Sequence, residues 1–179
     1  MMIRGEWTSP ARSYQNSGMN PYVERILGLL GDRPVVESLG HTANRIEAIA
    51  GTLDAGRMER AYAPGKWTAR QILAHLADCE LAVGFRLRQA LAEENHKAQP
   101  FDQDRWATRY AALDGAIALR SFVALRPWNL ALIRSLSPQD LARPYVHGER
   151  GPESVGLIVK MLAGHDLNHL AQLEQIAAA

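Results

Sequence analysis

Cysteine is almost absent from this chain: Cys79 is the single cysteine among 179 residues. One thiol excludes an internal disulfide framework, which is typical of a protein from a reducing compartment. No stretch approaches the roughly 20 consecutive apolar residues of a membrane-spanning helix, and the first residues contain no apolar signal-peptide core. We therefore expect a cytoplasmic protein that has no membrane partner.

An excess of either charge is also missing. Twenty basic residues against nineteen acidic ones leave a formal net charge of +1, and no long run of one sign occurs. Because nucleic acids and anionic membranes are bound by clustered basic residues, we do not expect nucleic acid as a partner. The composition, 47% apolar and 22% charged, is that of a globular chain with its own hydrophobic core.

The alternation of apolar and polar residues that indicates β-strands is not found over any length. Residues 1–19 are polar and are expected to form an N-terminal arm, and residues 20–179 are expected to form a single domain. Apolar residues recur at helical spacing in four long segments, the first of them broken. These segments span about 21–31 with 34–53, 68–94, 113–136 and 153–177. The pattern predicts an all-α fold, a four-helix bundle with two long connections.

Capping residues mark several helix boundaries. Asn20 followed by Pro21 is a typical helix start, with Asn as the cap and Pro at the first helical position. Thr68 and Gln71 have the spacing of a capping box, in which each side chain satisfies an amide of the other residue. Pro127 lies inside the third long segment and is expected to kink or divide that helix, since its ring removes one backbone hydrogen bond.

Two histidines, His165 and His169, lie four residues apart near the end of the sequence. On a helix this spacing places both imidazoles on one face, where they can chelate a divalent ion. Such a pair also arises by chance on a surface, or with each ring bonded separately in a core. Two observations favour a metal: the pair interrupts an apolar stripe, where unpaired imidazoles are costly, and His75 lies on the stripe of another long helix. Since facing helices of a bundle can bring inward residues onto one ion, we interpret the three histidines as one site with open coordination positions.

The stretch His165-Asp-Leu-Asn-His169 is close to the H-E-x-x-H signature of zinc peptidases, but a peptidase is not expected. Asp166 replaces the glutamate that acts as general base and is shorter by one methylene. Only ten residues follow His169, which leaves no room for a later third ligand. Asp166 and Asn168 point away from the face of the histidine pair, so we expect them at a surface or an interface.

Several neighbouring residues are candidates for supporting roles. Asp78, one turn after His75, could orient an imidazole or could be an exposed helix charge. Arg86, three turns after His75, could bind an anionic substrate group or could be a surface arginine. Cys79 could approach a metal as a thiolate, although a lone buried cysteine is more often a small apolar residue.

The remaining aromatic and histidine residues are expected to have no catalytic role. Trp67 is expected to pack at the helix start or plug the end of the bundle. Phe101 and Trp106 either line a substrate entrance or anchor their loop by packing, and packing is favoured. The other histidines lie in loop-like or polar contexts and are treated as bystanders: His41, His96 and His147.

Two segments together resemble a known family. PGKWTARQILAHLADCE, followed much later by GHDLNHLAQLEQI, is similar to the DinB-like superfamily of metal-binding four-helix bundles, and the resemblance covers about residues 35–176. It implies that His75, His165 and His169 hold one divalent ion, usually nickel or zinc in relatives. Ligation by nitrogen alone argues against magnesium and calcium, which prefer oxygen.

The resemblance also implies a class of activity, because the superfamily includes bacillithiol, mycothiol and glutathione S-transferase relatives. We expect a metal-dependent thiol S-transferase-like enzyme that uses a low-molecular-weight thiol on an unknown small molecule. A metal-dependent hydrolase and a non-enzymatic metal-binding stress-response protein are the alternatives. A homodimer is expected, since relatives often pair.

Overall fold

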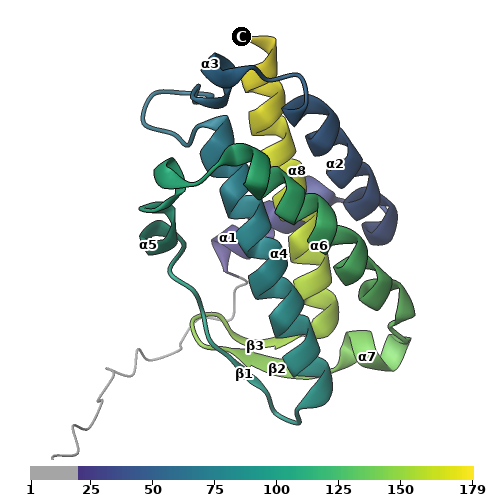
Figure 1. Ribbon diagram of the computed structural model, residues 1–179. Coiled ribbons are helices and arrows are strands. Elements are labelled where there is room, and N and C mark those ends of the chain that lie inside the picture. The colour runs from purple at the N-terminus through teal and green to yellow at the C-terminus, as the bar shows by residue number, and fades with distance from the viewer. Residues whose placement is uncertain (1–19) are drawn as a thin grey trace, which may run out of the picture.

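The computed structural model describes residues 20–179, so the arm expected at residues 1–19 lies outside the described residues. Four long helices run alongside one another (Figure 1). They are α2 (Val35–Ala50), α4 (Ala69–Ala92), α6 (Gly115–Ser135) and α8 (Val155–Ala178). α4 and α2 each pack against both α6 and α8, and the shorter α1 (Pro21–Leu30) lies along α8. The all-α four-helix bundle predicted from the sequence is confirmed.

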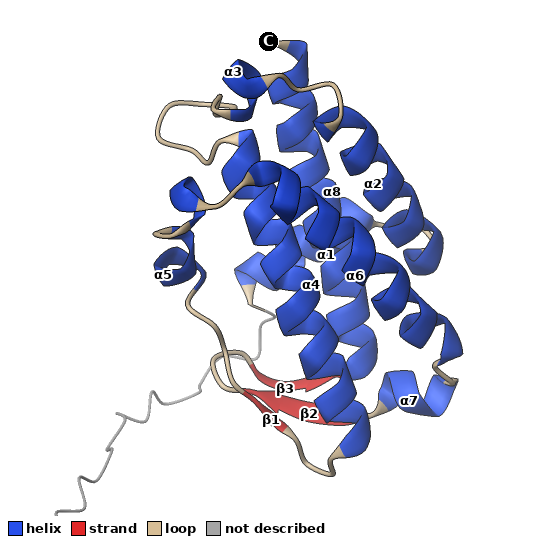
Figure 2. Cartoon of the chain, in the orientation of Figure 1, coloured by secondary structure: helices blue, strands red, loops and turns tan. Residues whose placement is uncertain are grey.

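Short elements connect the long helices (Figure 2). They are the helices α3 (Ala55–Met58), α5 (Gln103–Ala107), η1 (Tyr110–Ala112) and α7 (Pro138–Ala142), and the strands β1 (Lys97–Ala98), β2 (Pro144–His147) and β3 (Gly151–Ser154). The strands form a small sheet at the opposite end of the bundle from the C-terminus.

Three short strands occur in the described residues although the sequence shows no strand alternation. β1 pairs with β2 in parallel, and β2 pairs with β3 antiparallel. The strands have only two or four residues, which is too short for an alternating pattern to be visible. The long connection 95–112 thereby gains a fixed path, because β1 ties it to the segment that precedes α8.

The predicted helix starts agree with the structure. The Asn20 side chain accepts a hydrogen bond from the Tyr22 amide, and Thr68 and Gln71 form the reciprocal capping box. Pro127, by contrast, does not divide α6, which is assigned as helix from Gly115 to Ser135. Pro127 is exposed, so water can reach the carbonyl that its ring leaves without a partner.

α6 also differs from the expectation that no segment is long and apolar enough to span a membrane. By length and mean hydropathy, 1.3 over its most apolar window, it is the one helix in residues 20–179 that could cross a membrane. In the structure it packs along α4 and α2, and its Arg126 is buried in ion pairs inside the bundle. The apolar character of α6 is therefore used, at least in part, for packing within the bundle.

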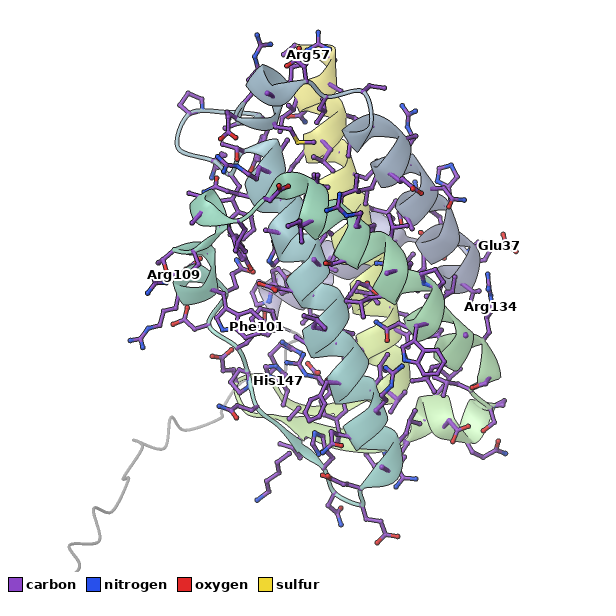
Figure 3. The ribbon with its side chains drawn as sticks, in the orientation of Figure 1. Glu37, Arg57, Phe101, Arg109, Arg134 and His147 are labelled. Atoms are coloured by element: carbon purple, nitrogen blue, oxygen red, sulfur yellow. The ribbon has the colours of Figure 1, made fainter. Side chains whose placement is uncertain are left out.

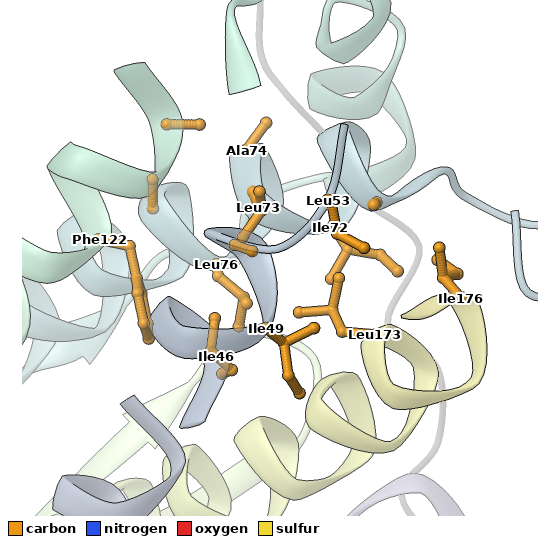
Figure 4. Packing of buried hydrophobic residues seen from close by; sticks show 14 of the residues in the cluster. Ile46, Ile49, Leu53, Ile72, Leu73, Ala74, Leu76, Phe122, Leu173 and Ile176 are labelled. Carbon is orange, nitrogen blue, oxygen red and sulfur yellow. The ribbon is translucent and has the colours of Figure 1, made fainter. Parts of the chain in front are cut away.

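Two apolar clusters fill the interior of the bundle. The first lies toward the C-terminal end of α8 (Figure 4) and contains residues from all four long helices, among them Ile46, Ile72, Leu76, Phe122 and Leu173. The second lies toward the sheet and contains, among others, Leu39, Leu87, Leu130, Tyr145 and Leu162. Between the two clusters, each long helix contributes a buried polar side chain: Thr42, Glu80, Arg126 and Asp166.

A layer of buried charges occupies this middle level. The Arg126 guanidinium donates to Glu80 Oε1 from Nε at 3.0 Å and from Nη2 at 2.6 Å, and it also forms an ion pair with Asp166. Thr42 donates to Asp166 Oδ2 at 2.9 Å, and Asn129 donates to Glu80 Oε2 at 2.9 Å. The layer thus connects α2, α4, α6 and α8.

The surface or interface position expected for Asp166 is wrong, because the side chain is fully buried in this layer. α8 is packed against α1, α2 and α4, so that more than one of its faces is covered. A single apolar stripe does not describe such a central helix. Asn168 is partly exposed and accepts a hydrogen bond from Arg25 at 3.0 Å, as expected for a residue near the surface.

Candidate metal centre

The structure brings the three predicted histidines together at one point between α4 and α8. The Nε2 atoms of His75 and His165 are 2.9 Å apart, and those of His165 and His169 are 3.1 Å apart. The His75 and His169 ring centroids are separated by 4.9 Å. His75 and His169 are buried, whereas His165 is partly exposed.

These separations fit a shared metal ion. Two nitrogens bound at about 2.0–2.1 Å to a tetrahedral ion lie about 3.3 Å apart, and the observed values are within a few tenths of an ångström of that distance. Hydrogen bonding explains the cluster less well. A neutral imidazole carries one proton, so three converging Nε2 atoms cannot all find a donor among themselves.

Electrostatics favours the metal-binding protonation state of each ring. Burial lowers the pKa of His75 to about 3, and the neighbouring His169 acts in the same direction. Burial also lowers the pKa of His169 to about 4 and places the pKa of His165 well below its usual value. All three rings are therefore neutral near pH 7, and a neutral imidazole can offer a nitrogen lone pair to a metal.

Gln172 fixes which nitrogen of His169 is available. Its side-chain oxygen lies 2.8 Å from His169 Nδ1, so the proton of the neutral ring resides on Nδ1 and the lone pair on Nε2. The Gln172 Nε2 donates a hydrogen bond to the Tyr62 hydroxyl at 3.4 Å. Gln172 was not predicted from the sequence, although its position three residues after His169 places it on the same helix face.

Trp67 packs against the histidines instead of simply plugging the end of the bundle. Its ring is stacked on His169, with 6.2 Å between centroids and 11° between planes, and it lies 4.8 Å from the His75 ring. Trp67 therefore has the structural role that was expected, and the side chains it packs against are the two histidine rings. The indole restricts the orientations of two imidazoles and covers one side of the cluster.

Cys79 is a further donor at this point. Its Sγ atom lies 3.4 Å from His75 Nε2, and one donor atom from each of His75, Cys79 and His165 lies within 4.8 Å of the others. Burial, together with the charges of Asp166 and Glu80, raises the pKa of the thiol, so without a cation it stays protonated. Cys79 and His169 are thus two candidates to complete a set that contains His75 and His165.

A pocket of about 330 Å³ opens beside the cluster. His75, Cys79 and His165 form part of its wall, and Arg86 and Arg150 lie farther along it. The apolar part of the wall comprises Val83, Pro100, Phe101, Ile158, Met161 and Leu162. A molecule in this pocket would therefore contact two of the histidines directly.

Only some of the candidate supporting residues lie at the pocket. Arg86 and Phe101 line the pocket, but Asp78 and Trp106 do not. Burial raises the pKa of the Asp78 carboxyl, whose charge acts on Tyr110, and Tyr110 lies behind the His75 ring with 6.3 Å between centroids. Trp106 is exposed and packs on Phe101 with 4.8 Å between ring centroids, so it supports the loop.

His147 was expected to be a bystander in a loop-like, polar context, but the structure places it in the pocket wall. It ends β2, is buried, and lines the same pocket as Phe101 (Figure 3). Its sequence context is a polar loop, and only the path of the sheet turns it inward. His41 and His96 do not line this pocket.

The fold and the cluster define a class: a helical bundle with a histidine cluster, spaced to fit a divalent ion, beside a pocket. The family model described as the DinB superfamily matches residues 38–173, a span that includes all three histidines. The chain belongs to the DinB superfamily.

Similar proteins have names that point to metal-dependent chemistry. A protein of Oceanobacillus iheyensis named as a putative metal-dependent hydrolase is 35% identical over 125 residues, which cover 69% of this chain and 73% of that protein. A second protein of that organism, with the same description, is 29% identical over 132 residues, covering 73% and 76% of the two chains.

A solved structure shares the fold. YfiT from Bacillus subtilis, described as a probable metal-dependent hydrolase with an unusual four-helix bundle topology, superposes with a TM-score of 0.74. The match covers 97% of this chain and 93% of that one at 19% sequence identity. At this identity the likeness concerns the fold alone.

Proposed function

We propose that this protein is a divalent-metal-dependent enzyme that hydrolyses a small molecule. The observation that carries the proposal is the convergence of the imidazoles of His75, His165 and His169 beside a pocket. The hydrolase names of the relatives support the reaction class. The pocket, about 330 Å³, lies at the lower end of the usual range for small-molecule sites.

In this proposal the three histidines hold one ion through their Nε2 atoms, and zinc or nickel fits the all-nitrogen set. When bound, the ion supplies Lewis acidity that promotes ionisation of water or a thiol. The protein's own residues orient the ligands and the substrate. Gln172 keeps His169 in the metal-binding tautomer, Trp67 shields the rings on one side, and the apolar wall orients the substrate.

Thiol transfer is the second candidate, and one observation favours it. Among the described residues that line the pocket, Glu149 is the only carboxylate, and it is exposed. A hydrolase in which a carboxylate takes a proton from water would need one near the histidines. A thiol ionises more readily than water and depends less on such a base.

Metal analysis combined with turnover assays tests the proposal. Protein purified without a nickel column is compared with His169→Ala and with the surface control Gln139→Ala. The proposal predicts about one divalent ion per chain in the wild type and control, and a loss of metal and turnover in His169→Ala. Equal metal content in all three proteins would contradict the site.

The substrate panel separates the reaction classes. Turnover of esters or amides without added thiol supports the hydrolase, whereas turnover of an electrophile only with a low-molecular-weight thiol supports the transferase. A non-enzymatic metal-binding protein would lose thermal stability on metal removal and would turn over no member of either panel.

We also propose a homodimer that uses the outer faces of α4 and α6. Leu81 and Phe85 on α4 and Trp128 on α6 are large apolar side chains exposed to solvent. Light scattering coupled to gel filtration is expected to give twice the chain mass of 19.8 kDa, and Phe85→Glu is expected to give the monomer.

A further inference from the structure

The end of the pocket away from His75 and His165 contains the buried cation Arg86, which has no counter-ion among the described residues. Arg86 is only 9% exposed and lines the pocket. Its Nη2 donates to the Gln99 carbonyl at 3.3 Å, and no carboxylate of residues 20–179 lies within ion-pair distance of its guanidinium. Because a buried charge is costly unless it is paired, this arrangement indicates that a ligand supplies the missing anion.

Glu153, an acidic residue near Arg86, already accepts hydrogen bonds from other residues. Glu153 accepts hydrogen bonds from Arg150 Nε at 2.5 Å and Nη2 at 2.9 Å, and also from the Tyr145 hydroxyl. Its charge is therefore shared between Tyr145 of β2 and Arg150 of the turn between β2 and β3. Burial lowers the pKa of Arg86, although Tyr145 and Glu153 act in the opposite direction, so an anion beside Arg86 would offset part of the cost of burying its charge.

His147 supplies a second donor at this end. Its Nδ1 faces the backbone amides of Glu149 and Arg150 at 3.2 and 3.4 Å and accepts from them. Burial and the two arginines lower the pKa of His147 to about 4, so the neutral ring carries its proton on Nε2. No residue in the described part of the chain accepts a hydrogen bond from that N–H.

The distance between Arg86 and the metal-site histidines indicates how long a ligand must be to reach both. His75, Cys79, Val83 and Arg86 lie along one face of α4 and all line the pocket. Eleven residues at about 1.5 Å per residue separate the Cα atoms of His75 and Arg86 by roughly 16 Å. An anionic group at Arg86 is therefore several bonds away from the group that meets the histidines.

We propose that Arg86, assisted by the Nε2–H of His147, binds the carboxylate of a small organic acid whose apolar body lies along Val83 and Ile158 and whose other end reaches the histidines. The proposal rests on the proposed function and specifies its substrate class. A carboxylate fits better than a phosphate, because the end offers one unpaired positive charge and one neutral donor. The guanidinium fork matches the two oxygens of a carboxylate.

Calorimetric titration with a charged and an uncharged probe of similar shape tests this assignment. Phenylacetate is expected to bind the metal-loaded wild type about 10- to 100-fold more tightly than phenylacetamide. Arg86→Met is expected to reduce that ratio to near one, and Arg86→Lys to an intermediate value. Arg120→Met, which removes the same charge from an exposed position on α6, is expected to leave the ratio unchanged.

The outcomes distinguish this proposal from the proposed metal site. Metal content and melting temperature are measured for every variant, so a loss of folding is recognised. A preference for phenylacetate that survives in Arg86→Met but disappears in His169→Ala would place the carboxylate at the histidines and overturn the role of Arg86. A wild type without any preference would also overturn it, and inorganic phosphate that competes as strongly as phenylacetate would overturn the carboxylate class.

Discussion

The close approach of α1 to α8 at Gly164 provides a sharp test of the packing. A Cβ atom at this position would overlap the carbonyl oxygen of Ile26 and come within 2.9 Å of both the carbonyl carbon and Cγ2 of that residue. The obstacle is largely backbone, so rotation of a side chain cannot remove it. Gly164→Ala must push α1 away from α8, and Gly164 directly precedes His165.

The expected cost combines two opposing effects. Overpacking of a core typically costs about 1–3 kcal/mol, and the backbone clash favours the upper end. Alanine improves the helix propensity at an interior position by about 1 kcal/mol. The net expectation for Gly164→Ala is a loss of about 2 kcal/mol in the free energy of unfolding. In a chain of this size that corresponds to a fall of about 4–8 °C in melting temperature.

Gly28→Ala is the matched control. Gly28 lies on the exposed side of α1, and an added Cβ would have no neighbour within 4 Å. The same chemical change should therefore raise the melting temperature by up to about 4 °C, since only the helix propensity is altered. Both variants are melted in metal-free form by circular dichroism. A Gly164→Ala protein that unfolds at or above the wild-type temperature would refute the close packing of α1 on α8.

Three further outcomes are expected. Gln172→Leu should weaken metal binding about 10- to 100-fold with little change in fold, because the proton of His169 is no longer held on Nδ1. Competition with a chromophoric chelator measures this affinity, and an unchanged value would exclude the orienting role of Gln172. Cys79→Ser should remove a near-ultraviolet charge-transfer band from the cobalt-substituted protein if the sulfur binds the metal, whereas His169 completes the set if the wild type lacks such a band. Arg126→Met should cost about 3–5 kcal/mol in urea unfolding, because it leaves two buried carboxylates without their cation, and a cost below 1 kcal/mol would contradict the buried layer.

The sequence was sufficient for the parts of the site that depend on helix periodicity. His165 and His169 share a face because they are four residues apart, and His75 could be assigned to the interior because its helix has a clear apolar stripe. These inferences need no knowledge of neighbouring elements. The four-helix bundle follows in the same way, from the lengths of the segments and from the caps at Asn20 and Thr68.

The errors concern residues whose environment is set by tertiary packing. Asp166 lies beside a histidine on a helix that is covered on more than one face, so being off the apolar stripe did not mean being exposed. His147 belongs to a four-residue strand that is fixed by pairing with β1 and β3. Trp67 has the packing role that was expected, but its partner, a histidine on α8, could not be named from the sequence. None of these contacts has a local sequence pattern.

The buried layer gives the site an electrostatic environment that the histidines alone do not provide. Arg126 neutralises one of the two carboxylates, Glu80 and Asp166, which leaves the layer with one excess negative charge. One oxygen of Asp166 has no hydrogen-bond partner in the described part of the chain, and the charge of Asp166 raises the pKa of both His169 and Cys79. In a medium of low dielectric constant this charge favours a cation beside His169 and Cys79, whereas Arg126 and Arg25 act in the opposite direction on His165. A divalent ion bound beside His169 would therefore offset part of the cost of burying Asp166.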